Sequence, residues 1–95
     1  MNQPVNRAIN RPLKVLYFAW LRDRVGRSEE DVQPPGNVTT VGELMAWLAR
    51  QSDGHGEAFN DPAIIRCAIN QDYAKADAAI SAGDEVAFFP PVTGG

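Results

Sequence analysis

The most informative segment for the fold is a mainly apolar and aromatic run followed by two prolines and a glycine pair: Glu85-Val86-Ala87-Phe88-Phe89-Pro90-Pro91-Val92-Thr93-Gly94-Gly95. The run from Glu85 to Phe89 predicts a strand, because β-branched and aromatic residues favour extended backbone. Pro90 and Pro91 lack N–H donors and fix φ, so the strand cannot continue past Phe89. We therefore expect residues 90–95 to protrude from the domain as a tail.

The glycine pair gives this tail its expected chemistry. Gly94 and Gly95 have no Cβ and can thread a channel too narrow for side chains. An α-carboxyl group has an unperturbed pKa of about 3.5, so at neutral pH it is an anion and a poor electrophile. It must be activated, for example as an acyl adenylate, before an amine, thiol or sulfide attacks. The alternative is an ordinary frayed terminus, but the proline pair and the aromatic strand favour a working tail.

Upstream, a first strand is expected at 13–21. Both of its alternating rows are apolar: Val15, Tyr17 and Ala19 form one row, and Leu16, Phe18 and Trp20 form the other. A strand in an open sheet normally shows one polar face. Either the domain covers both faces of this strand, or a partner covers one of them.

The segment 22–26 predicts a charged turn or short helix that ends at Gly26, and 28–32 predicts an edge strand. The residues 34–37 form a loop by composition. Thr40 and Glu43 match a capping box, which predicts a helix over about 40–52. Its apolar residues recur on one face: Val41, Leu44, Met45 and Leu48, with Trp47 at the edge. Gly54 suits the left-handed position just after the helix.

The second half of the chain predicts three more strands. Residues 54–61 are expected to be a flexible connection with at most a helical turn at 57–60. A strand at 64–69, a turn at 70–72, a short strand at 73–74 and a turn at 81–84 lead to the final strand. One main helix and a mixed sheet of about five strands in this order indicate an α+β fold of the β-grasp, ubiquitin-like type. We assign 1–11 to a loose N-terminal extension and 12–89 to the β-grasp domain.

Composition limits the class of protein. The chain has 95 residues, 44% hydrophobic and 22% charged, which is typical of one globular domain. Its net charge of −3 argues against nucleic acid or an anionic membrane as the main partner. The single cysteine excludes an internal disulfide and favours the cytoplasm. No apolar run approaches the length of a membrane span, and the opening residues lack a charged-then-apolar pattern, so we expect neither a membrane span nor a signal peptide.

Several other residues invite a functional interpretation. Cys67 lies in an apolar alternating row, so we expect a buried, inert thiol rather than a sulfur donor. His55 stands between two glycines and has no second histidine near it, so we expect a solvated loop residue. Phe88 and Phe89 alternate, so one should enter the core and the other can anchor a partner. Arg22 is expected to be solvent-exposed, with partner docking as the alternative.

Three segments, 15–22, 68–71 and 83–95, resemble the small subunits of molybdopterin synthase, and the likeness extends over 13–95. The resemblance implies a β-grasp fold and a thiocarboxylate on Gly95. In that family an activating enzyme uses ATP to adenylate the carboxylate, and sulfur then replaces AMP. The tail next enters a large subunit, where it gives sulfur to cyclic pyranopterin monophosphate during molybdenum cofactor synthesis.

The resemblance also implies roles for individual residues and partners. The tail residues Pro90, Pro91, Val92, Thr93 and Gly94 would occupy the partner's channel, and Phe18, Arg22, Phe88 and Phe89 would contact the partner. Two small and two large subunits would form the enzyme, and this chain would bind no cofactor itself. Two alternatives stay open: a sulfur carrier of another pathway, such as the thiazole (thiamine) type or a tungsten-pterin variant, and a ubiquitin-like protein modifier.

Overall fold

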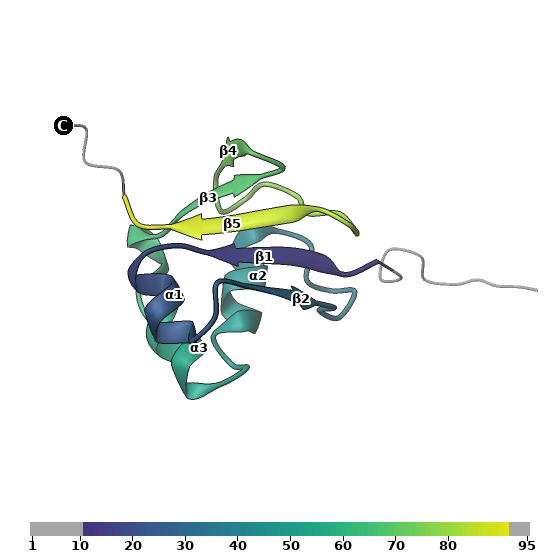
Figure 1. Ribbon diagram of the computed structural model, residues 1–95. Helices are drawn as coiled ribbons and strands as arrows, with labels where there is room; N and C mark the ends of the chain where they lie inside the picture. The colour runs from purple at the N-terminus through teal and green to yellow at the C-terminus, as the bar shows by residue number, and fades with distance from the viewer. Residues whose placement is uncertain (1–10, 92–95) are drawn as a thin grey trace, which may run out of the picture.

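The final strand lies at the centre of a five-stranded mixed sheet (Figure 1). A computed structural model describes residues 11–91. Its strands are β1 (Leu13–Tyr17), β2 (Glu29–Val32), β3 (Arg66–Ile69), β4 (Asp72–Ala74) and β5 (Glu85–Phe89), arranged in the order β2-β1-β5-β3-β4. Strand β5 runs parallel to β1 and antiparallel to β3. The predicted mixed sheet and its edge strand at 28–32 are confirmed.

Within the described part of the chain, three helices and one 3-10 turn accompany the sheet: α1 (Trp20–Val25), α2 (Val41–Leu48), α3 (Asp53–Ala58) and η2 (Pro62–Ile64). Figure 1 shows α1 and α3 at the end of the sheet to which β1 and β5 point. The helices lie on one side of the sheet, and no element within residues 11–91 forms a layer over its other side. None of the helices within residues 11–91 has the length and hydrophobicity that crossing a bilayer requires.

The predicted capping box starts α2. The backbone N–H of Glu43 donates to Thr40 Oγ1 over 3.2 Å, and the backbone N–H of Thr40 donates to Glu43 Oε1 over 3.2 Å. These reciprocal bonds satisfy two donors that a helix start leaves unpaired. The predicted stripe faces the core, since all four of its members are buried: Val41, Leu44, Met45 and Leu48.

The end of this helix was predicted wrongly. Helix α2 stops at Leu48, and Ser52 caps a new helix, α3, because its Oγ accepts the backbone N–H of His55 over 3.1 Å. Gly54, expected after the end of α2, lies inside α3. A Cβ at this position would overlap the backbone oxygen of Arg24, so only glycine permits this approach of α3 to α1. The predicted flexible connection at 54–61 is thus largely helical.

The first strand is also shorter than predicted. It ends at Tyr17, because Ala19 adopts a positive φ of 57° and the chain enters α1 at Trp20. Gly26 ends α1 with a φ of 94°, as the sequence indicated. Leu21 is therefore a core residue on a helix rather than the end of a strand. The turn leaves Phe18 46% exposed at the end of β1.

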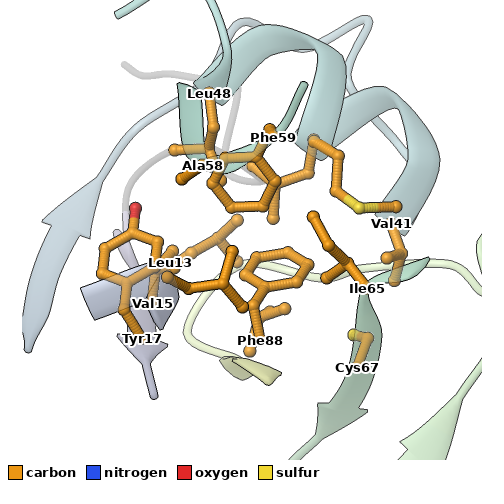
Figure 2. Packing of buried hydrophobic residues seen from close by; sticks show 14 residues of the cluster. Leu13, Val15, Tyr17, Val41, Leu48, Ala58, Phe59, Ile65, Cys67 and Phe88 are labelled. Atoms are coloured by element: carbon orange, nitrogen blue, oxygen red, sulfur yellow. The ribbon is translucent and has the colours of Figure 1, made fainter. Parts of the chain in front are cut away.

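The core fills the space between the sheet and the helices (Figure 2). Phe88 of β5 and Val15 of β1 have no exposed surface. Figure 2 shows the ring of Phe88 facing that of Phe59, and the ring centroids are 5.1 Å apart in an edge-to-face arrangement. Burying a side chain such as Phe88 contributes about 1.5–3 kcal/mol to folding. The core therefore holds β5 firmly from its inner face.

Candidate functional site

The base of the predicted tail is a rigid strand end. Strand β5 stops at Phe89, and Pro90 and Pro91 follow it, as predicted. Tyr17 of β1 pairs with Phe88 on one side, and Arg66 of β3 pairs with Phe89 on the other. Because β5 is bonded on both edges and buried on its inner face, it fixes the point from which the chain leaves the domain.

Of the predicted tail, only Pro90 and Pro91 are among the described residues. The structure does not describe residues 1–10 of the predicted N-terminal extension or the last four residues of the tail. These four are Val92, Thr93 and Gly94, predicted to occupy the partner's channel, and Gly95, predicted to carry the reactive group. Their roles stay predictions.

The face of the sheet opposite the helices carries an apolar patch beside this strand end. We call it the outer patch, and it comprises Leu16, Phe18, Ala68, Tyr73, Ala87 and Phe89. The strand register brings it together from four segments, because Ala87 pairs with both Leu16 and Ala68, and Ala68 pairs with Tyr73. Phe18 donates its backbone N–H to the carbonyl oxygen of Phe88 over 3.1 Å, which places it next to β5. An exposed apolar patch of this kind is typical of a protein interface.

The two phenylalanines of β5 divide as predicted. Phe88 is fully buried, whereas Phe89 belongs to the outer patch and is half-buried. Phe88 therefore contributes core packing, and its expected role in contacting a partner does not fit its burial. Phe89 and Phe18 are free to contact one.

Tyr73 is a member of the outer patch that the sequence reasoning missed. Its side chain is 83% exposed, and its ring lies 5.9 Å from that of Phe89. A shallow hollow of about 270 Å³ opens beside this pair and is lined by Arg66, Cys67, Tyr73, Ala74 and Phe89. The available signal in the sequence was a large aromatic residue in a short strand directly after a turn.

Two arginines of α1 lie at the same end of the sheet. Arg22 is exposed, and its Nε lies 3.8 Å from Asp23 Oδ1, which is a weak surface pair. The guanidinium of Arg24 stacks over the ring of Trp20 at 4.6 Å. The predicted exposure of Arg22 is confirmed, and its contact with a partner stays a prediction.

Cys67 is the buried thiol that the sequence predicted. It points to the inner face of β3 with 5% of its surface exposed, and burial raises the pKa of the thiol to about 11. A thiol that is protonated at neutral pH and shielded from solvent is a poor nucleophile. Within residues 11–91, no grouping of three His, Cys, Asp or Glu side chains is suited to hold a metal ion.

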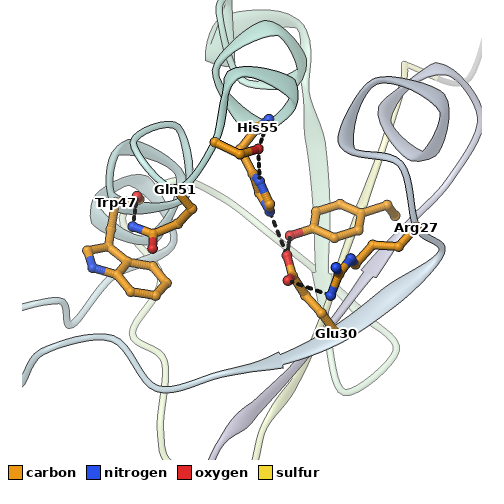
Figure 3. A network of polar contacts seen from close by, with 7 residues as sticks. Arg27, Glu30, Trp47, Gln51 and His55 are labelled. Carbon is orange, nitrogen blue, oxygen red and sulfur yellow. Dashed lines mark hydrogen bonds and ion pairs between the residues drawn. The ribbon is translucent and has the colours of Figure 1, made fainter.

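The prediction for His55 is wrong. His55 lies on α3, is 7% exposed, and its Nε2 is 2.6 Å from Glu30 Oε2 on β2 (Figure 3). Its Nδ1 lies 2.7 Å from Ser52 Oγ, and Tyr17 donates its hydroxyl to Glu30 Oε2 over 2.6 Å. We call Tyr17, Glu30, Ser52 and His55 the polar latch. Sequence proximity did not reveal it, because Glu30 is 25 residues from His55.

The electrostatics of the polar latch are those of a structural contact. Burial alone would raise the pKa of Glu30, but the hydrogen bonds from Tyr17 and His55 and the nearby positive charge of Arg27 hold it below its ordinary value. Burial raises the pKa of Tyr17, and its bond to Glu30 adds to the effect. The latch therefore keeps an ionised carboxylate between two buried donors and ties α3 to β1 and β2.

Comparison with known proteins places this geometry in context. A sequence profile of the ThiS family matches residues 15–95. The chain is 42% identical over 83 residues to the molybdopterin synthase sulfur carrier subunit of Escherichia coli strain K12, covering 87% of this chain and 99% of that relative. The protein of the same name from Haemophilus influenzae is 36% identical with the same coverage.

A solved structure supports the fold. SAMP1 of Haloferax volcanii, a small archaeal modifier protein, superposes with a TM-score of 0.67 at 29% identity, covering 88% of this chain and 99% of its own. The predicted β-grasp, ubiquitin-like fold is confirmed. The sheet, its helical layer and its central last strand are thus shared with proteins of this type.

Proposed function

The chain belongs to the ThiS family, and from this we propose that it is the sulfur-carrier small subunit of a molybdopterin synthase. The observation that carries the proposal is the position of β5. This strand lies at the centre of the sheet and ends at Phe89, beside the outer patch. A partner protein that binds the residues after Phe89 must therefore also cover the outer patch. The names of the curated relatives supply the pathway.

In the proposed cycle the reacting group is the α-carboxylate of Gly95. A separate activating enzyme transfers AMP from ATP to one carboxylate oxygen and releases pyrophosphate. A sulfide equivalent then displaces AMP, leaving a C–S bond where a C–O bond was. The ionised thiocarboxylate attacks a side-chain carbon of the pterin substrate as a sulfur nucleophile, forming a C–S bond while a C–O bond at that carbon breaks and its oxygen departs with the bonding electron pair. Water then cleaves the acyl–sulfur bond, which leaves the sulfur on the pterin and returns the carboxylate of Gly95.

The burial of Cys67 supports a carrier that uses its terminus. A cysteine that passed sulfur between proteins would need access to solvent and a thiolate at neutral pH, and Cys67 has neither. The carboxylate tail is then the remaining place for the sulfur. The catalytic side chains and the pterin and ATP sites would belong to the two partner proteins.

The outer patch is the proposed docking surface for the large subunit. Phe18, Tyr73 and Phe89 present aromatic surface next to the base of the tail, and aromatic residues dominate the energetics of many interfaces. Burial of this patch would supply affinity, while Pro90 and Pro91 direct the tail into the partner. The activating enzyme must also enclose the tail, so we expect it to use an overlapping surface.

Intact-mass spectrometry tests the proposal. The chain is incubated with ATP, the activating enzyme and a sulfur source, and it should gain the mass of one oxygen-to-sulfur exchange. Fragmentation should localise the gain to Gly95, and the Cys67→Ala control should gain the same mass. Localisation to Cys67, or no gain in a variant that lacks this thiol, would contradict the proposal.

The likeness to SAMP1 keeps a protein modifier as the second candidate. A modifier forms isopeptide bonds between its terminal carboxylate and lysines of many proteins. A sulfur carrier instead returns to the free chain after each cycle. Lysine-linked adducts of this chain across many cellular proteins would favour the modifier, and a sulfur carrier of the thiazole type would be distinguished by its acceptor substrate.

A further inference from the structure

Arg66 is a positive charge placed at the base of the tail. It is the first residue of β3 and the direct cross-strand neighbour of Phe89, the last residue of β5. Its side chain is exposed and lines the hollow beside Tyr73 and Phe89. In a chain with a net charge of −3, this cation stands at the point that a tail-binding partner must cover.

The guanidinium of Arg66 is only partly satisfied by the domain itself. Its Nη1 donates to the carbonyl oxygen of Ala63 over 3.3 Å. Among residues 11–91 no carboxylate lies within ion-pair distance of it. Of the five N–H donors of a guanidinium, most therefore face solvent in the free chain.

Burial of the Arg66 guanidinium in an interface is unfavourable in free energy unless the partner's surface pairs with it. A partner that encloses the residues after Phe89 must lie over Arg66, because the two residues are opposite each other in the sheet. Removing a guanidinium from water without a charged or hydrogen-bonding partner is strongly unfavourable. The planar fork of arginine matches a carboxylate, which can accept two of its N–H groups at once.

On the basis of the proposed function, we infer that the hollow formed by Arg66, Tyr73 and Phe89 receives a carboxylate side chain of the large subunit. The acidic side chain would pair with the guanidinium, and its methylene groups would lie against the two aromatic rings. The contact would add charge selectivity to the apolar docking of the outer patch. It would also fix the orientation of the partner around the strand end, since a bidentate pair is directional.

Affinity measurements with the intact chain and the large subunit from the same organism test the inference. Arg66→Met keeps the length of the aliphatic stem but removes the charge, and it should raise Kd by about 30-fold. Arg66→Glu should raise Kd by about 100-fold or more, because two carboxylates would then face each other. Matched controls are Arg50→Met and Arg50→Glu. Arg50 is exposed just after α2, away from the outer patch, so these controls should change Kd by less than about twofold.

Cross-linking identifies the carboxylate directly. In the Arg66→Lys variant, a zero-length carbodiimide should join the lysine amine to the partner's carboxylate as an amide, with loss of water. Mass spectrometry would map the acidic residue, and the Arg50→Lys control should give no such product. If the unmodified chain binds and transfers sulfur while the Arg66 variants bind equally well and no cross-link forms, the inference is wrong but the proposed function stands. If the unmodified chain does not bind the large subunit, the proposed function fails and the inference fails with it.

Discussion

Removal of the Glu30 carboxylate should destabilise the fold far more than removal of its sequence neighbour. Glu30→Ala leaves the Tyr17 hydroxyl and the His55 ring without their shared acceptor, and these residues are 1% and 7% exposed. A buried polar group without a partner costs about 1–3 kcal/mol. The variant leaves two such groups without a partner, and water that fills the space of the lost carboxylate would hydrate one of them in part. We therefore expect a loss of about 3 kcal/mol in the free energy of unfolding.

The matched control is Glu29→Ala. Glu29 lies on the same strand but faces solvent, with its side chain 56% exposed and its carboxylate 3.5 Å from Lys14 Nζ. Exposed pairs of this kind contribute less than about 1 kcal/mol, so this variant should lose no more than about 0.5 kcal/mol. In a domain of this size, 1 kcal/mol corresponds to about 4–8 °C in Tm. The Tm of Glu30→Ala should therefore lie about 10 °C or more below the Tm of Glu29→Ala.

The pH dependence gives an independent check on the same carboxylate. The folded protein holds the pKa of Glu30 below its ordinary value of 4.5, so at this group the unfolded chain binds protons more readily. The contribution of Glu30 to stability is therefore present above pH 4.5 and is lost as the pH falls through the folded pKa. The stability difference between the unmodified chain and Glu30→Ala should shrink in that acidic range. An equal loss of stability for Glu29→Ala and Glu30→Ala at pH 7 would refute this reasoning.

Three further predictions concern the core, the tail and the outer patch. Phe88→Ala should cost about 3–5 kcal/mol in chemical denaturation, since its fully buried ring would leave a cavity. Gly94→Val should leave Tm unchanged but block sulfur transfer, as measured by pterin conversion; a loss of Tm like that of Phe88→Ala would contradict a role outside the core. Phe18→Ser should weaken binding of both the large subunit and the activating enzyme in titrations, and the two should displace each other. A ternary complex without displacement would show that their surfaces do not overlap.

The predictions for the end of α2 and for His55 were wrong for the same reason, which is that tertiary contacts rather than local sequence determine α3. The periodic pattern of α2 identified the helix, but its end was placed too late because Ser52 fits both the end of one helix and the start of the next. His55 was assigned to solvent because its partner, Glu30, is distant in sequence. A short helix that is held by such a contact has no strong local pattern, so tertiary packing decides its existence.

Local sequence patterns were enough to predict the succession of strands along the chain, the capping box at Thr40, the burial of Cys67 and the end of β5 at Phe89. These features depend on local chemistry: alternation of apolar residues, a side chain that caps its own helix, and the missing N–H of proline. The positions of Tyr73 and Arg66 beside Phe89, and the contact of Glu30 with His55, depend on how the elements pack together. Such contacts join residues far apart in the chain, and they arise from the register of β3, β4 and β5 and from the packing of α3 against the sheet, neither of which a local pattern encodes.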